Sequence, residues 1–114
     1  MADKMELQVV GLNYRLTPAK IAKIKRETPL RCVLEREPMN AHDENAIKVV
    51  ITQRPWAHEG EGLHIGYIAR QTAQVLAGKL DGGKFPFTDV WVTDVDVDKG
   101  IGDLLLKRPL RQKK

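Results

Sequence analysis

Residues 30–52 read LRCVLEREPMNAHDENAIKVVIT, and this stretch decides the fold. In its first part apolar and polar residues alternate up to Pro38, and its last part is β-branched and mostly apolar. Both patterns are typical of β-strands. We therefore expect strands over residues 30–37 and 46–52 that pair as an antiparallel hairpin across a long polar connection.

Further short strands are predicted on both sides of this hairpin, over residues 5–10, 64–69, 85–97 and 102–107. Within residues 85–97 the apolar positions change parity between Val92 and Val95, which predicts a β-bulge near Thr93 and Asp94. A turn at residues 98–100 makes the last two strands a hairpin.

Two helices are predicted between these strands. Thr17 and Pro18 form a capping residue followed by a first helical residue, and the sequence Thr28-Pro29 ends that helix. An apolar stripe over residues 70–80, ended by two glycines, predicts the second. About six strands and two helices indicate a mostly β fold, a small antiparallel barrel.

The composition is that of one globular domain. The chain has 114 residues, of which 42% are hydrophobic and 30% charged. Its net charge of +4 arises from residues 107–114, because the other residues carry 14 basic and 15 acidic groups. We expect a single domain over residues 1–106 and a disordered basic tail over residues 107–114; a weak contact with a polyanion is the alternative for the tail.

Several classes of function are disfavoured by the sequence. It has no apolar run long enough for a membrane span and no secretory signal, so we expect a cytoplasmic protein. Cys32 is the single cysteine and the three histidines are dispersed, which argues against disulfides, metals and other cofactors. Since nucleophile and phosphate-loop motifs are absent, we expect no enzyme.

The polar connection of the first hairpin holds Asp43 and Asn45. Both side chains suit the capping of backbone amides in turns, and both also suit a binding site. The spacing of a calcium-binding loop is absent. The residues alone leave these two interpretations open.

Three stretches together resemble the HIRAN domain: VVGLNY at residues 9–14, LEREPMNAHDENAIKV at 34–49 and IGYIAR at 65–70. The resemblance covers about Met5 to Leu106 and points to a stand-alone bacterial or phage form. It implies an OB-like barrel of about six strands that binds DNA. In members fused to replication-fork remodelling helicases the domain captures the 3′ end of single-stranded DNA, which connects it with DNA repair and fork processing.

The resemblance also implies roles for individual residues. Tyr14 resembles the aromatic residue that stacks on the terminal base. Asp43 resembles the aspartate that accepts a hydrogen bond from the free 3′-hydroxyl and repels a 3′-phosphate. Tyr67 is expected to stack on a base or donate to a phosphate, and Arg70 to form a phosphate pocket at a helix N-terminus.

Three weaker positions complete the expected DNA-binding set. Asn13 occupies a basic or polar position of the family, and Arg15 stands where the end-capturing members have a second aromatic residue. Lys48 is expected to contact a phosphate, although a solvated strand lysine is the alternative. Phe85 and Phe87 are expected to close a barrel end or to extend the stacking surface.

A second function stays open for the same fold. The body of the protein is nearly neutral, whereas a phosphate-binding surface is usually basic. The alternative is therefore a monomeric protein–protein interaction module whose partner, such as a helicase or nuclease, belongs to a repair, nuclease or phage complex.

Overall fold

The computed structural model describes residues 3–57 and 61–108. The chain forms six strands and three helices: β1 (Lys4–Val10), α1 (Leu12–Arg15), α2 (Pro18–Glu27), β2 (Leu30–Arg36), β3 (Ile47–Ile51), β4 (Leu63–Ile68), α3 (Arg70–Asp81), β5 (Asp89–Asp96) and β6 (Ile101–Lys107). The mostly β fold class is confirmed.

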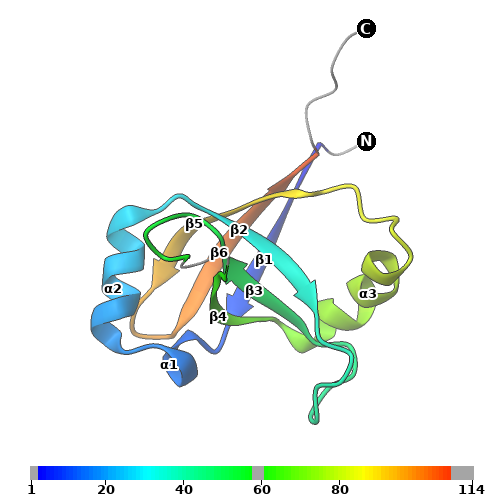
Figure 1. Ribbon diagram of the computed structural model, residues 1–114, viewed down its shortest axis with the longest axis horizontal. Helices are drawn as coiled ribbons and strands as arrows, with labels where there is room; N and C mark the ends of the chain where they lie inside the picture. The colour runs from blue at the N-terminus through cyan, green and yellow to red at the C-terminus, as the bar shows by residue number, and fades with distance from the viewer. Residues whose placement is uncertain (1–2, 58–60, 109–114) are drawn as a thin grey trace, which may run out of the picture.

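The six strands close into one antiparallel barrel in the order β1-β4-β3-β2-β5-β6, and β6 pairs back with β1. β2 and β3 form the expected hairpin, and so do β5 and β6. The barrel therefore matches the small antiparallel barrel that the sequence pattern predicted and the OB-like fold that the family resemblance implied. Helices α1 and α2 lie at one end of it, and α3 lies at the opposite end, close to the connection between β2 and β3 (Figure 1).

The barrel interior is filled by aliphatic side chains that alternate with exposed ones along each strand. On β2, Leu30 and Cys32 are buried, whereas Arg31 and Val33 are exposed. Burial raises the pKa of the Cys32 thiol to about 12. A thiol with such a pKa stays protonated and unreactive, so Cys32 serves as a small core residue.

Helix α2 begins and ends where the sequence predicted. The Thr17 hydroxyl accepts a hydrogen bond from the backbone N–H of Lys20, and Pro18 is the first helical residue. Ile21 and Ile24 are buried against the barrel, which explains why the helix lies across this end of it.

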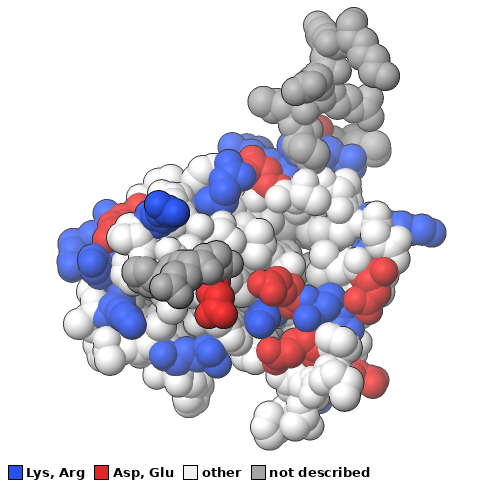
Figure 2. All heavy atoms as spheres, in the orientation of Figure 1, with Lys and Arg blue, Asp and Glu red and all other residues white. Residues whose placement is uncertain are grey.

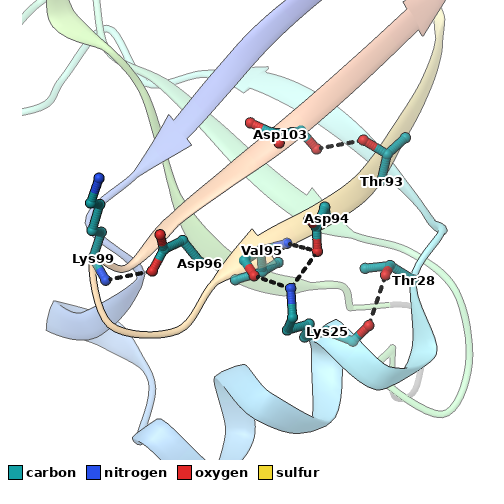
Figure 3. Close-up of polar contacts among 8 residues, drawn as sticks. All are labelled: Lys25, Thr28, Thr93, Asp94, Val95, Asp96, Lys99 and Asp103. Atoms are coloured by element: carbon teal, nitrogen blue, oxygen red, sulfur yellow. Dashed lines mark hydrogen bonds and ion pairs between the residues drawn. The ribbon is translucent and has the colours of Figure 1, made fainter.

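The predicted β-bulge is confirmed by a register shift between Val92 and Asp94. Lys25 Nζ of α2 donates to Asp94 Oδ1 at 2.7 Å and to the Val95 carbonyl at 2.9 Å (Figure 3). The hydrogen bond from Lys25 lowers the pKa of the Asp94 carboxyl. These contacts fasten α2 to the bulge.

Two elements differ from the expectation. The single turn of α1 was not predicted; it follows Gly11, whose φ of 80° lies in the left-handed region and turns the chain away from β1. The strand expected from residue 85 begins at Asp89. Pro86 has no N–H for a strand ladder, and Phe85 and Phe87 are buried in the core, where their rings meet edge to face.

Within the two described ranges, no helix is both long and apolar enough to cross a membrane. In the same ranges no group of three or more His, Cys, Asp and Glu side chains is placed to hold a metal ion. Lys107 is the last residue of β6, and residues 109–114 of the expected tail lie outside the described part of the chain.

Candidate functional site

A pocket of about 290 Å³ brings together residues from three separate stretches of the chain. Its polar lining consists of Asn40, His42 and Asp43 from the β2–β3 connection, Tyr67 from β4, and Arg70, the first residue of α3. Larger hollows of about 390, 520 and 540 Å³ lie elsewhere on the surface, and none of them holds Asn13, Tyr14, Arg15, Asp43, Lys48, Tyr67 or Arg70.

Asn40 organises the β2–β3 connection. Its Oδ1 accepts hydrogen bonds from the backbone N–H groups of His42, at 2.8 Å, and Asp43, at 3.1 Å. Its Nδ2 donates to Glu37 Oε1 at 2.6 Å. Asp43 Oδ1 in turn accepts from the Asn45 N–H at 2.9 Å, so Asp43 caps a turn and also lines the pocket.

Asp43 and Arg70 form a loose ion pair across the pocket, with Asp43 Oδ2 3.8 Å from Arg70 Nε. The Asp43 side chain is 18% exposed, whereas that of Arg70 is 70% exposed. Such an exposed pair contributes little to stability. It places a hydrogen-bond acceptor and a phosphate-binding guanidinium side by side.

Tyr67 is held by two neighbours. Its hydroxyl donates to Glu37 Oε1 at 2.8 Å, and its ring meets that of His64 edge to face at 4.8 Å. Hydrogen bonds from Asn40 and then Tyr67 lower the pKa of Glu37, while burial and then the bond to Glu37 raise the pKa of Tyr67. The hydroxyl hydrogen of Tyr67 is thus engaged by Glu37 rather than free to donate to a phosphate.

None of the predicted residues of α1 lines the pocket. Tyr14 is 91% exposed. Arg15 Nε donates to the His64 carbonyl at 3.2 Å, which ties α1 to β4. Asn13 turns toward the β5–β6 turn, where a Cβ on Gly100 would lie 2.7 Å from Asn13 Oδ1.

Lys48 is half-buried and also stands next to the pocket lining. In the sheet register it lies opposite Tyr67 on β4 and Glu35 on β2. Residues directly opposite each other in an antiparallel pair share a face of the sheet. Lys48 therefore extends the row of polar groups from the pocket along the outer face of the barrel.

Gly66 allows the close approach of β1 and β4 on which the pocket depends. A Cβ at this position would collide with the Val10 carbonyl oxygen and would lie 2.9 Å from the Val9 side chain. Only glycine leaves room for the β1 backbone here. This contact explains the glycine between Ile65 and Tyr67.

Sequence reasoning assigned no role to four residues near the pocket, Glu37, Asn40, His42 and His64. A signal was present for Asn40, because an Asn in a proline-containing polar loop is typical of an Asx turn. No local signal marks the bond between Glu37 and Tyr67, which lie 30 residues apart. Burial and the nearby charge of Arg15 lower the pKa of His64, which is therefore neutral at pH 7.

Comparisons with known proteins agree with this architecture. The crystal structure of the HIRAN domain of human HLTF is similar, with a TM-score of 0.66 and 21% identity, over 92% of this chain and 74% of that one. The crystal structure of a protein from Lactobacillus plantarum is also similar, with a TM-score of 0.64 and 26% identity, over 91% of this chain and 92% of that one.

No curated protein matches the chain significantly. The sequence model of the HIRAN domain, a DNA-binding fold, matches residues 3–105. The match spans nearly the whole barrel, and the chain therefore belongs to the HIRAN domain family.

Proposed function

We propose that this domain binds single-stranded DNA and captures its free 3′-hydroxyl end in the pocket beside α3. The observation that carries the proposal is the convergence on one pocket of Asp43, from the β2–β3 connection, with Tyr67 and Arg70, from the junction of β4 and α3. Free 3′ ends of this kind arise in DNA repair and replication-fork processing. We assign the domain no catalytic step.

Asp43 supplies the selectivity for the hydroxyl. Its Oδ1 is occupied by the Asn45 N–H, whereas Oδ2 makes no hydrogen bond within the described structure and lies 3.8 Å from Arg70 Nε. A carboxylate oxygen accepts from a hydroxyl. A 3′-phosphate would place a charge of about −2 against this carboxylate and would be repelled.

Arg70 and Tyr14 supply contacts that do not depend on the base. The exposed guanidinium of Arg70 is suited to the phosphate that precedes the terminal sugar. The exposed ring of Tyr14 offers a stacking face for a neighbouring base. Stacking of this kind contributes about 1–3 kcal/mol per base.

Fluorescence anisotropy with short labelled strands tests the proposal. The strands carry a 3′-hydroxyl, a 3′-phosphate, a 3′ end blocked by a hairpin, or a blunt duplex end. We expect the 3′-hydroxyl to bind about 10- to 100-fold more tightly than the 3′-phosphate, the strength of one hydrogen bond to a charged group. Equal binding of the two ends would contradict end capture.

Asp43→Asn is the variant that isolates the carboxylate. The amide oxygen of Asn retains an acceptor for the Asn45 N–H, so the turn is kept while the charge is removed. We expect this variant to lose most of the discrimination between the two ends. Glu44→Gln is the matched control, because Glu44 is the adjacent exposed carboxylate and does not line the pocket.

A second candidate function is a protein-interaction module of the same fold. One observation favours it: β2 pairs with β5 only from Leu30 to Cys32, and an apolar groove of about 390 Å³, lined in part by Val33 and Phe85, lies beside the rest of β2. Such a groove suits an extended apolar peptide. Absence of binding to all four DNA ends would favour this function.

A further inference from the structure

Helix α2 presents a row of basic side chains at the end of the barrel opposite α3. Its sequence PAKIAKIKRE carries four basic groups and one acidic group. Lys20, Lys23 and Arg26 follow one another at intervals of three residues, so they form one row on the helix surface. We call these three residues the α2 row. Figure 2 shows basic groups gathered over this helix.

Within the described part of the chain, the basic groups of α2 outnumber the carboxylates around them. The single carboxylate of α2, Glu27, accepts a hydrogen bond from Trp56 Nε1 at 3.0 Å. Asp94, on the β5 side of the helix, is paired with Lys25. Among residues 3–57 and 61–108, no acidic side chain forms an ion pair with any member of the row.

An aromatic residue lies beneath the row. Lys23 Nζ stands 5.4 Å from the centre of the ring of Trp56, a half-buried residue of the β3–β4 loop. The ring attracts the ammonium group and restricts its position. Basic groups combined with aromatic rings are the pattern of surfaces that follow the backbone of a single strand.

Helix α1 lies between the α2 row and β4, the strand that carries Tyr67 of the pocket. Arg15 contacts the His64 carbonyl on β4, and only Leu16 and Thr17 separate α1 from α2. The exposed ring of Tyr14 lies on this short helix. A strand whose 3′ end occupies the pocket can therefore run past Tyr14 toward α2.

We propose that the α2 row binds the phosphodiester backbone of the strand on the 5′ side of the captured end. This inference rests on the proposed function. It gives α2 a larger share of the sequence-independent affinity than the pocket, where the one guanidinium of Arg70 lies beside the carboxylate of Asp43. The ligand is the phosphate backbone itself, so the binding depends on strand length and salt rather than on base identity.

The test compares the full chain with a triple variant, Lys20→Gln, Lys23→Gln and Arg26→Gln. The control variant, Lys4→Gln, Lys79→Gln and Lys84→Gln, removes the same charge from exposed positions outside α2 and the pocket. Each protein is titrated with 3′-hydroxyl strands of four and of twelve nucleotides. The twelve-nucleotide strand is also made with uncharged methylphosphonate linkages in its 5′ half.

We expect the unmodified chain to bind the longer strand more tightly, and the α2 variant to lose this gain while keeping its preference for the 3′-hydroxyl. Three single-strand phosphate contacts correspond to a salt slope of about −2, so a fourfold rise in salt weakens them about 20-fold. The α2 variant should lack this part of the salt dependence, and the uncharged linkages should weaken the unmodified chain but not the variant.

The α2 proposal is overturned if the α2 variant loses no more affinity than the control variant, or if the uncharged linkages weaken both proteins equally. These results can occur while the preference for the 3′-hydroxyl is intact, in which case the proposed function stands. Conversely, loss of length dependence in the α2 variant without any end preference in the unmodified chain supports the α2 row and contradicts end capture. No binding of any strand overturns both.

Discussion

The pocket and the α2 row are built in opposite ways. In the pocket, one carboxylate and one guanidinium, of Asp43 and Arg70, stand side by side, and hydrogen bonds from the neighbouring polar side chains hold Tyr67. In the α2 row, the charges have one sign, are exposed and form no ion pair among the described residues. A fixed, balanced site suits selectivity and an unbalanced one suits affinity. The difference teaches that one small barrel can keep the two properties on separate elements.

The largest effect on the difference between the two regions is expected from Asn40→Ala, which removes the hydrogen bonds that order the β2–β3 connection beside the pocket. Two backbone N–H groups would lose their acceptor, and Glu37 would lose a donor. We expect the free energy of unfolding to fall by about 1–3 kcal/mol and the end discrimination to disappear. Urea denaturation and anisotropy measure the two effects.

Asn45→Ala is the control for this change, because the Asn45 side chain makes no hydrogen bond within the described structure. Binding through the α2 row should survive in the Asn40 variant, since among the described residues no hydrogen bond of Asn40 reaches α2. An Asn40→Ala protein that still discriminates between the ends would show that the loop does not need this side chain.

Tyr14→Ala acts between the two regions. The side chain is 91% exposed, so its removal should change the free energy of unfolding by no more than about 0.5 kcal/mol. Loss of one stacking contact should weaken both the short and the long strand by about 1–3 kcal/mol in anisotropy titrations. Tyr14→Phe should bind like the unmodified chain; if it binds as weakly as the alanine variant, the ring does not stack.

The smallest expected effect is a dependence of the free energy of unfolding on pH, caused by His64 and Glu37, the two groups that contact Tyr67. The fold lowers the pKa of His64 from its ordinary 6.5, so the unfolded chain binds the proton more tightly. The contribution of His64 to stability is therefore fully present above pH 6.5 and is lost as the pH falls from that value through the lowered pKa of the folded state. Glu37, whose pKa is also lowered, adds a second decrease below pH 4.5.

His64→Gln distinguishes the decrease in stability caused by His64 from that caused by Glu37, because glutamine has no titrating group. The Gln amide can donate to the Gly66 carbonyl in place of the ring nitrogen, so the contact is kept. Urea denaturation at several pH values should show the decrease in the free energy of unfolding below pH 6.5 in the unmodified chain and not in the variant. A decrease of the same size in both proteins would assign it to another group.

Local patterns were sufficient to predict much of the barrel. The residues around Thr17 and Pro18 marked the start of α2, and the parity change after Val92 marked the bulge. The single turn of α1 is too short for an apolar period to reveal it. The expected strand at Phe85 was wrong because core packing and Pro86 outweighed the alternation of residue types.

The site was predictable only in part, and for a physical reason. Sequence reasoning selected Asp43, Tyr67 and Arg70 through a family resemblance, and the fold brings them to one pocket. It passed over Glu37 because the partner of Glu37, Tyr67, lies on a strand 30 residues away. Contacts between distant segments depend on strand register, which no local pattern specifies.

The first and last strands meet at the residues where the barrel begins and ends. Lys4 pairs with Lys107, and the Arg108 N–H donates to the Asp3 carbonyl at 3.2 Å. This junction lies at the far side of the barrel from the β2–β3 connection (Figure 1). The start of β1 and the end of β6 are therefore adjacent, so a circular permutant in which a short linker joins them should fold. The whole barrel should also tolerate insertion into a loop of another protein, with the pocket left accessible.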